Sequence, residues 1–309
     1  MEMTLEKSPS VAIILLNWNG LEHTKKCLDS LREITFANAT VIVVDNGSQS
    51  EEVDALRSLG DIVLIENVKN LGFTGGNNVG INYAFEKGFD FIMLLNNDTV
   101  VEPNFIEPLI LALQDPRVGA AQPKINTMSE KNVIWNAGGT FNKVLGRPIT
   151  IGSGANDIGG YDDAKNIDWI TGCCLIFPRH LVSDVGLLND VFFILFEDVD
   201  WSLRARNAGY NLLYIPESKI YHFESATAKS IVKTKEGTRS PFRQYLNVRN
   251  HLFIVRRYVP FRFKGFAFFD QLFKISIYLG YYVLRGRWNK LRMTLRGLRD
   301  GLGEYRELS

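Results

Sequence analysis

Short apolar runs that alternate with helical patterns constrain the fold of this chain more than any other feature of its sequence. Each run is continuously hydrophobic, which is typical of strands buried on both faces of a sheet. Short connections join the runs to the helical segments, and Ser50 is placed to cap the second helix. This alternation predicts an α/β fold in which helices cover both faces of a mostly parallel sheet. The predicted strands are residues 11–16, 40–44, 62–65 and 91–95, and the predicted helices are residues 21–31, 51–59 and 77–87.

Clusters of Asn, Asp and Gly fall at the carboxyl ends of these predicted strands. They contain Asn17, Asp45, Asn77 and Asp98. Ligands of parallel sheets bind beyond the carboxyl ends of the strands, so we expect these four side chains to converge on one crevice. The alternative is that the same residue types only form turns there. Turns explain any single cluster well, but they explain all four together less well than a ligand site does.

The second half of the chain is less regular before it returns to the same alternation. Residues 126–168 are rich in Gly, Asn and Asp and show little periodicity. We interpret them as a β-rich or irregular insertion that crosses the crevice. Beyond it, strands are predicted at residues 169–177 and 211–215, and helices at residues 179–185 and 198–207.

The chain is long and apolar enough to fold, and its charge is unevenly distributed. It has 309 residues, of which 46% are hydrophobic and 22% are charged. This allows a large buried core. Residues 229–309 carry 18 Lys and Arg against 5 Asp and Glu, whereas 17 basic and 29 acidic residues precede them. A basic tail on an acidic body predicts contact with an anionic partner, either nucleic acid or an anionic membrane leaflet.

The cysteines and the N-terminus indicate a reducing compartment. Cys27, Cys173 and Cys174 are too few for a disulfide framework, and the last two lie in an apolar run. The first 20 residues include acids and a single six-residue apolar run, which is too short for the core of a signal peptide. We therefore expect the main body of the chain to stay in the cytoplasm.

Six segments together carry a likeness to a known family. In chain order they are VAIILLNWNG, VIVVDNGS, NLGFTGGNN, FIMLLNNDT, TGCCLIFPRHLVSDVGLL and FEDVDWSLRARNAGY. In this order and spacing they resemble family 2 glycosyltransferases of the rhamnosyltransferase-like group, over residues 10–225. The resemblance implies the A-type glycosyltransferase (GT-A) fold, a nucleotide-diphosphate sugar donor, Mg²⁺ or Mn²⁺, and inversion at the anomeric carbon. We place the GT-A domain at residues 8–228 and a C-terminal helical, membrane-associating region at residues 229–309.

The resemblance also assigns a donor side. Asp45 matches the acidic position that accepts a hydrogen bond from a pyrimidine base, whose ring N–H a carboxylate can bind. Gly76 and Asn77 lie in the segment that matches the donor-binding loop of the family, with Asn77 as its polar contact, and Asn17 is assigned to the same side. The alternatives are that Asp45 caps the next helix and that the glycines only form a tight turn.

Asn96, Asn97 and Asp98 occupy the place of the family's Asp-x-Asp metal motif. Hard cations prefer oxygen ligands, and one that bridges a diphosphate needs only one or two carboxylates. Asp98 is the predicted metal ligand, and the two asparagines are predicted to contact the donor. Because Asn96 stands where the family has its first Asp, we expect weaker metal binding. His222 matches a His that reaches the metal or the diphosphate, the alternative being an ordinary core or surface residue.

Three acids follow an apolar run as Glu197, Asp198 and Asp200. Like-charge repulsion and partial burial both raise a carboxyl pKa toward the range of a general base. By resemblance, Asp198 removes the proton of the acceptor hydroxyl and Glu197 shapes the acceptor site. Arg204 is spaced for an i,i+4 ion pair with Asp200. The alternative is an acidic helix N-terminus favoured by the helix dipole.

The tail, residues 242–309, interleaves aromatic residues with Arg and Lys. Residues 266–284 approach the length of a spanning helix, but Asp270, Gln271 and Lys274 are costly in hydrocarbon. We therefore predict helices that lie in the membrane interface, with basic side chains on anionic phosphates. A tilted or re-entrant span and a soluble dimerisation helix pair are the alternatives. The residues predicted to face the phosphates are Arg285, Arg287, Lys290, Arg292 and Arg296.

These patterns favour an inverting transfer of a sugar, with deoxythymidine diphosphate (dTDP) rhamnose as the leading donor. The predicted acceptor is a hydroxyl of a lipid-linked or cell-surface glycan at the cytoplasmic face of the membrane. A nucleotidyltransferase is an alternative, but its Gly-rich loop with Arg and Lys is missing after residue 16. A non-catalytic glycan- or lipid-binding scaffold of the same fold is another, because of Asn96. We do not predict nucleic-acid binding, since the acidic body would repel a polyanion. The oligomeric state stays open.

Overall fold

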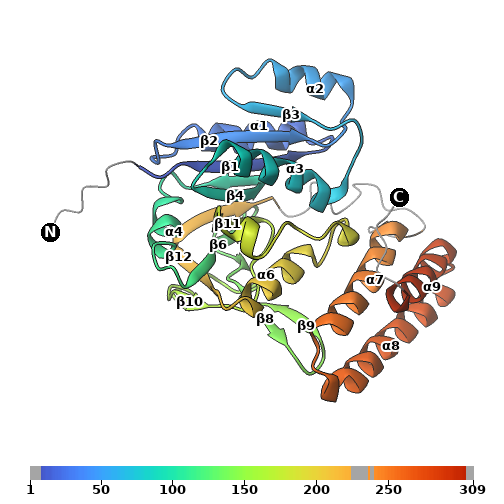
Figure 1. Cartoon of the computed structure of the whole chain (residues 1–309). Helices are drawn as coiled ribbons and strands as arrows, with labels where there is room; N and C mark the ends of the chain where they lie inside the picture. The colour runs from blue at the N-terminus through green and yellow to red at the C-terminus, as the bar shows by residue number, and fades with distance from the viewer. Residues whose placement is uncertain (1–7, 224–235, 237–239, 304–309) are drawn as a thin grey trace.

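The computed structural model describes residues 8–223, 236 and 240–303, and a mixed sheet lies at its centre (Figure 1). The strands of this sheet are β1 (Val11–Asn17), β2 (Ala39–Asp45), β3 (Val63–Glu66), β4 (Phe91–Asn96), β5 (Thr99–Val101), β6 (Val118–Thr127), β7 (Ile134–Asn136), β10 (Lys165–Asn166), β11 (Cys174–Pro178) and β12 (Asn211–His222). They lie in the order β10-β12-β6-β11-β4-β1-β2-β3, with β5 on β12 and β7 on β6. Strands β1 to β4, β6 and β12 run parallel to one another, so the predicted mostly parallel sheet is confirmed.

Helices cover both faces of the sheet, as predicted. They are α1 (Leu21–Leu31), α2 (Ser50–Arg57), α3 (Gly72–Lys87), α4 (Glu107–Ala112), α5 (Leu181–Asp184) and α6 (Glu197–Asn207), with the 3₁₀ turn η1 (Asp190–Phe192) before α6. Side chains of β1 alternate between the two faces. Ile13 packs in a cluster with residues of α1, α2 and α4, whereas Ile14 packs in a second cluster with residues of α3, α5 and α6. The core therefore consists of two apolar layers, one on each side of the sheet.

Helix α3 differs from the prediction, because it begins at Gly72 and not at Asn77. The glycine-rich segment was expected to be a loop, and that expectation was wrong. A Cβ on Gly76 would lie 2.4 Å from Leu16 Cδ1, and one on Gly80 would lie 2.5 Å from the same strand. The missing side chains thus let the helix lie directly on β1. This packing outweighs the low helix propensity of glycine.

Three smaller differences concern the ends of elements. The N-cap of α2 is Gln49, so Ser50 is its first residue and not its cap. The strand predicted at residues 169–177 is shorter, since β11 begins at Cys174. The strand predicted at residues 211–215 is longer, since β12 runs to His222. The insertion is β-rich as expected, and it includes a separate hairpin of β8 (Gly139–Asn142) and β9 (Arg147–Thr150).

Three long helices of the C-terminal region lie together beside the sheet (Figure 1). They are α7 (Pro241–Tyr258), α8 (Phe261–Leu284) and α9 (Trp288–Leu302). Arg147 of β9 makes an ion pair with Asp270 of α8 and joins this group to the hairpin. Within the described ranges, no helix has both the length and the hydrophobicity needed to cross a membrane. The predicted domain boundary at 228/229 lies outside the described residues.

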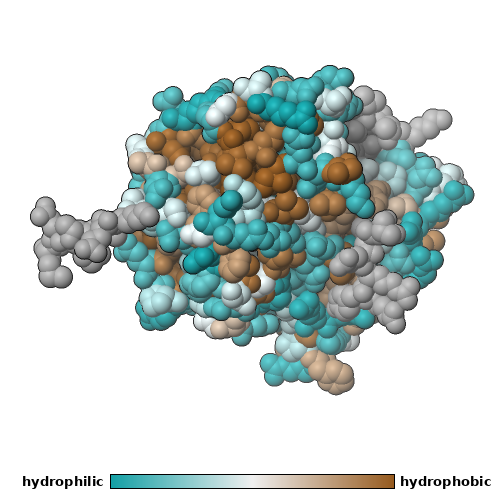
Figure 2. Space-filling model, turned by 45° about the horizontal axis from the view of Figure 1, so that its top comes forward, coloured by the Kyte–Doolittle hydropathy of each residue, from teal (hydrophilic) through white to brown (hydrophobic). Residues whose placement is uncertain are grey.

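Hydrophilic residues cover much of the surface in the view of Figure 2, where one hydrophobic patch lies near the upper edge. Some of the charged residues form exposed ion pairs, such as Arg57 with Glu66 at 2.6 Å and Arg32 with Asp61 at 2.7 Å. Pairs of this kind contribute little to stability because water screens them. The stability of the fold therefore depends mainly on the two apolar layers.

Candidate active site

The carboxyl ends of β1, β2 and β4 bring several predicted site residues together. Asn17 lies opposite Asp45 in the β1–β2 register, and β4 pairs with the other edge of β1. Asn17 is fully buried, and its amide donates to Asp45 Oδ1 at 2.9 Å. The Thr24 hydroxyl donates to Asn17 Oδ1 at 2.8 Å and accepts from the Asn97 amide at 2.8 Å. A continuous hydrogen-bonded chain therefore joins the ends of the three strands.

The carboxylate of Asp45 is buried and held from two directions. Its Oδ2 accepts from the backbone N–H of Gly47 at 3.1 Å and of Ser48 at 2.9 Å, while Oδ1 accepts from Asn17. An ionised carboxylate has about four acceptor positions, so the hydrogen bonds of the described residues leave one for a ligand. The turn that was the alternative explanation for Asp45 is present. Contact between Asp45 and the pyrimidine base of a donor stays a prediction.

Gly76 and Asn77 lie in the first turns of α3. Gly76 faces β1, so its missing side chain serves helix–sheet packing. The Asn77 amide donates to the carbonyl of Phe73 at 2.8 Å, within its own helix. The neighbouring Asn78 reaches out of the helix instead and donates to Asp190 Oδ1 at 2.9 Å. Contacts of Gly76 and Asn77 with a donor stay predictions.

Asp98 and His222 meet just beyond the end of β4. Asp98 Oδ1 lies 3.1 Å from His222 Nε2, and both residues are 7% exposed. Strand β12 carries His222 to this place, because it pairs with β5 so that His222 lies opposite Thr99. The His222 ring packs on Trp135 with ring centroids 4.4 Å apart, and its Nδ1 has no hydrogen-bond partner among the described residues. One carboxylate and one imidazole are therefore within contact distance.

This pair suits a cation that takes its other ligands from elsewhere. Carboxylates are ligands for Mg²⁺ and Mn²⁺, and a metal on a diphosphate needs few protein ligands. Across the part of the chain that the structure describes, no three His, Cys, Asp or Glu side chains form a self-sufficient metal site. Asn97 is hydrogen-bonded to Thr24, and the Asn96 N–H donates to the Cys173 carbonyl at 2.8 Å. The geometry therefore fits a metal shared with a diphosphate better than a structural metal.

Glu197 and Asp198 begin α6 on the other side of β4. Asp198 Oδ2 accepts from the Gly172 N–H at 3.0 Å. The next residue, Cys173, accepts from the Asn96 N–H through its carbonyl at 2.8 Å. The backbone of Gly172 and Cys173 therefore links the acids directly to the start of the metal motif. The predicted base and the predicted metal ligand lie at one end of the sheet, on the β11 and β4 sides.

Burial raises the pKa of both carboxyls of this pair. For Glu197, which is 5% exposed, burial is the larger cause, the charge of Asp198 adds to it, and Arg243 opposes it. For Asp198, burial outweighs the hydrogen bonds from the N–H groups of Gly172 and Val199. Glu197 Oε2 has no hydrogen-bond partner among the residues with described positions. A raised pKa with unused acceptor capacity is a property of general bases and of residues that bind hydroxyls.

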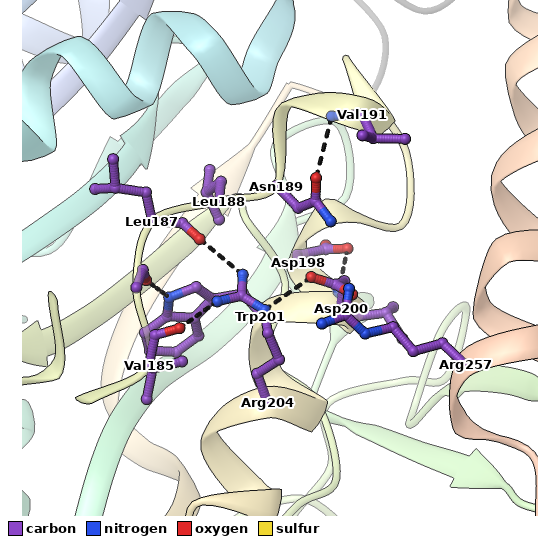
Figure 3. A network of polar contacts seen from close by, with 12 residues as sticks. Val185, Leu187, Leu188, Asn189, Val191, Asp198, Asp200, Trp201, Arg204 and Arg257 are labelled. Carbon is purple, nitrogen blue, oxygen red and sulfur yellow. Dashed lines mark hydrogen bonds and ion pairs between the residues drawn. The ribbon is translucent and has the colours of Figure 1, made fainter. Parts of the chain in front are cut away.

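Asp200 has a structural role in the same helix (Figure 3). Its buried carboxylate accepts from Arg204 Nε at 2.9 Å and from the Tyr258 hydroxyl at 2.6 Å, which confirms the predicted i,i+4 ion pair. Arg204 also donates to the carbonyls of Val185 and Leu187. This network fixes α6 to the segment that follows α5.

Two residues of the site were missed at the sequence level. Thr24 of α1 joins Asn17 to Asn97, and Trp135 of β7 covers one face of His222. Trp135 lies in the aperiodic insertion, where no local pattern distinguishes it. Thr24 lies seven residues after Asn17, and only the turn between β1 and α1 brings the two side chains together.

Comparison with known proteins gives several relatives of moderate similarity. The low-salt glycan biosynthesis hexosyltransferase Agl10 of Haloferax volcanii is 27% identical over 65% of this chain and 63% of its own. The dTDP-rhamnosyl transferase RfbF of Shigella flexneri is 25% identical over 74% of this chain and 75% of its own. The N-acetylglucosaminyl-diphospho-decaprenol L-rhamnosyltransferase of Mycobacterium tuberculosis is 24% identical over 69% of this chain and 76% of its own. A further relative, the uncharacterized protein y4gI of Sinorhizobium fredii, is 27% identical over 72% of this chain and 25% of its own. The chain therefore spans less than two thirds of the length of Agl10 and of y4gI.

Two solved structures share the fold. GalNAc-T7 with UDP, GalNAc and Mn²⁺ has a TM-score of 0.59 and 16% identity, over 72% of this chain and 45% of its own. The mannosyltransferase PcManGT of Pyrobaculum calidifontis with GDP-Man and Mn²⁺ has a TM-score of 0.55 and 14% identity, over 96% of this chain and 88% of its own. The sequence profile described as glycosyltransferase like family 2 matches residues 9–240. The chain therefore belongs to glycosyltransferase family 2 and has the GT-A fold, as its six sequence segments predicted.

Proposed function

We propose that this chain is an inverting glycosyltransferase that moves a sugar from a nucleoside diphosphate to an acceptor hydroxyl. The carrying observation is the placement of two acids. Asp98 lies beyond the end of β4, and Asp198 is hydrogen-bonded beside the start of the neighbouring β11. In an inverting displacement the leaving diphosphate and the attacking hydroxyl lie on opposite sides of the anomeric carbon. This arrangement supports the proposal that one acid serves the leaving diphosphate and the other the attacking hydroxyl.

The residues of the site would divide the work as follows. Asp198 takes the proton of the attacking hydroxyl, and burial raises its pKa, which is the direction that favours a general base. Glu197 offers its unpaired Oε2 to an acceptor hydroxyl. Asp98 and His222 would hold Mg²⁺ or Mn²⁺, and the ion would supply positive charge to balance that of the leaving diphosphate. Asp45 keeps one acceptor position for the N–H of a base, and its hydrogen bond from Asn17 fixes its orientation.

The names of the relatives favour a particular donor and acceptor. RfbF is named as a dTDP-rhamnosyl transferase, and the M. tuberculosis relative is named for an acceptor carried on decaprenyl diphosphate. We therefore propose dTDP-rhamnose as the donor and a lipid-linked or cell-surface glycan as the acceptor. The solved neighbours contain UDP and GDP-Man, so donors with those nucleotides are the natural competitors.

The proposed reaction is tested with a panel of donors. Purified protein is incubated with dTDP-rhamnose, UDP sugars or GDP sugars, Mn²⁺ or Mg²⁺, and a polyprenyl-diphosphate-linked acceptor. We expect metal-dependent release of nucleoside diphosphate, fastest with dTDP-rhamnose. Release of pyrophosphate would instead identify a nucleotidyltransferase. No release from any donor would support a non-catalytic scaffold.

The outer face of α8 supports a place at the membrane. Charged residues are absent from the exposed positions of the described helix between residues 265 and 284. Apolar surface of this extent normally marks an interaction site. The large exposed side chains of this outer face are Phe266, Phe269, Leu272, Phe273, Ile277, Tyr278, Tyr281, Val283 and Leu284.

The polar residues of α8 that argued against contact with hydrocarbon lie on its other side. Asp270 is paired with Arg147 of the hairpin and with Lys274 one turn later, at 3.2 Å. Gln271 is 5% exposed. The ion pairs of Asp270 and the burial of Gln271 thus keep both groups off the outer face, which is left free to enter an apolar medium.

Basic residues follow the outer face of α8 at the start of α9. Arg285, Arg292 and Arg296 are exposed, as the proposed contact with anionic phosphates requires. The prediction that Lys290 faces the phosphates is wrong, because Lys290 is only 6% exposed and its Nζ lies 5.9 Å from the centroid of the Tyr282 ring. An apolar face beside a basic edge is typical of helices that lie in a membrane interface. We therefore propose peripheral attachment at the cytoplasmic face of the membrane.

This attachment predicts a defined loss of vesicle binding. The double variant Phe269→Ser, Phe273→Ser is expected to bind vesicles of phosphatidylglycerol and phosphatidylcholine roughly a hundredfold more weakly, since burying each Phe contributes about 1.5–3 kcal/mol. Co-sedimentation measures this, and Val68→Ser, at an exposed position of the sheet domain, is the matched control. Equal binding by both variants contradicts the proposal. A stable dimer that dissociates in the double variant would identify the face as a contact between copies.

A further inference from the structure

The segment before the two acids has an uncommon backbone conformation. Residues 193–196 connect η1 to α6, and Phe193, Leu195 and Phe196 have φ angles of 63°, 74° and 72°. Non-glycine residues adopt positive φ rarely, and such a conformation persists only where the surroundings hold it. Phe196 directly precedes Glu197. The path of this segment therefore decides where the acids lie.

A buried asparagine of α7 binds two carbonyls of this segment and the carbonyl of Phe192, just before it. The amide of Asn250 donates to the carbonyls of Phe192, Ile194 and Leu195 at 2.9, 3.0 and 2.8 Å. Arg249, also buried, donates to the carbonyl of Phe192 at 3.2 Å and to Asn250 Oδ1 at 2.8 Å. If the segment changed its path, these buried groups would lose their partners, which is costly.

Helix α7 also contacts the chain on the other side of the acids. The Tyr258 hydroxyl donates to Asp200 Oδ1 at 2.6 Å, and Arg257 lies 3.4 Å from the same oxygen (Figure 3 labels Arg257 and Asp200). The His251 ring stacks on Phe196 with centroids 5.0 Å apart. One helix thus holds the chain both before and after the two acids.

The opposite side of the segment rests on the donor side of the crevice. The carbonyl of Phe193 accepts from the Thr74 N–H at 3.1 Å. A Cβ on Gly72 would lie 2.6 Å from that same carbonyl oxygen. The segment is therefore enclosed between α3 and α7, and both helices donate hydrogen bonds to its carbonyls.

We infer that Asn250 is a positioning residue, through which α7 holds residues 193–196 in the one conformation that places Asp198 against β11. The inference rests on the proposed role of Asp198 as a base, and it adds a requirement from outside the sheet domain. A helix that only covered a surface would have no reason to direct one side-chain amide, that of Asn250, at the carbonyls of Phe192, Ile194 and Leu195. By this account the C-terminal helices complete the active site as well as attach it to a membrane.

The test is Asn250→Leu, which keeps the size of the side chain and removes its donors. We expect kcat to fall on the order of 100-fold, as small displacements of catalytic groups do. The KM for the donor is expected to stay unchanged, because the described hydrogen bonds of Asn250 go to Phe192, Ile194, Leu195 and Arg249 and to no residue of the donor side. The acid limb of the pH–rate profile is expected to move to lower pH, since water would reach the acids and weaken the burial that raises their pKa. Besides the two carboxyls, the groups that face them are Arg243 of α7 and the thiol of Cys173 before β11.

Two further variants make the result specific. Asn247→Leu changes the same residue type one turn earlier, where no described hydrogen bond joins that side chain to residues 193–196, and it should behave as the wild type. Tyr258→Phe removes one hydroxyl from the far contact, and we expect a smaller fall in kcat with the same direction of pH shift. If Asn250→Leu does not fold, Tyr258→Phe carries the test on its own.

Hydrogen exchange separates this inference from the proposed function. The Asp200 N–H donates to the Phe196 carbonyl at 2.9 Å, so exchange at residues 197–200 reports on the segment without any substrate. Asn250→Leu is expected to speed that exchange, whereas Asn247→Leu is not. A wild type that releases no nucleoside diphosphate would overturn the proposed function and leave this readout intact. The positioning role would be overturned if Asn250→Leu and Tyr258→Phe had the same kcat, pH profile and exchange rates as the wild type.

Discussion

Asp198→Asn is expected to lower kcat about 1000-fold, within the range that general bases contribute. The amide keeps the shape of the side chain but cannot take the proton of the attacking hydroxyl. Donor binding should change little, because Asp198 lies on the β11 side, away from Asp45 and the end of β2. Release of nucleoside diphosphate under saturating donor measures the effect.

The pH profile of the wild type checks the same assignment. Burial raises the pKa of Asp198 above the ordinary Asp range, and a base must be deprotonated to act. Activity should therefore be lost as the pH falls through this raised pKa and be retained above it. Asp29→Asn, at an exposed carboxyl of α1, is the control and should keep both rate and profile. Full activity of Asp198→Asn would assign the proton transfer to another group.

Asp98→Ala is expected to abolish stimulation of the reaction by Mn²⁺ at ordinary concentrations. Loss of an outer-shell partner typically weakens metal binding 10–100-fold, so loss of the one carboxylate ligand should weaken it at least about 100-fold. His222 would remain, but an imidazole alone does not hold a hard cation well. The measurement is the Mn²⁺ dependence of nucleoside diphosphate release.

His222→Gln is the companion variant for this experiment. It removes the imidazole, leaves Asp98 in place, and is expected to raise the Mn²⁺ requirement less than Asp98→Ala does. The Asn96 position makes the comparison informative, because Asp98 is the single carboxylate of the motif. An unchanged Mn²⁺ response in both variants would remove the metal from this pair.

The sheet and its ligand-binding end were predictable from the sequence for a physical reason. Strands β1, β2 and β4 are buried on both faces, so they read as continuous apolar runs, and the chain must turn in polar residues where they end. The register of β1 on β2 then places Asn17 opposite Asp45. The i,i+4 pair of Asp200 and Arg204 was also predictable, because helix geometry alone determines it.

The remaining features depend on contacts between distant parts of the chain. Helix α3 begins early because its glycines fit against β1, a fact that local propensity does not contain. Lys290 is turned inward by the packing of the C-terminal helices, although the composition of the tail suggested a basic surface there. Asn250 binds carbonyls 55 to 58 residues away, and no spacing rule connects such positions.

Calorimetric titration of dTDP, with and without Mn²⁺, tests the central claim most directly. The account predicts that Mn²⁺ tightens dTDP binding to the wild type and to Asp198→Asn, and that this tightening disappears in Asp98→Ala. The claim would be contradicted if Mn²⁺ had no effect on the wild type, or if Asp98→Ala retained the full effect.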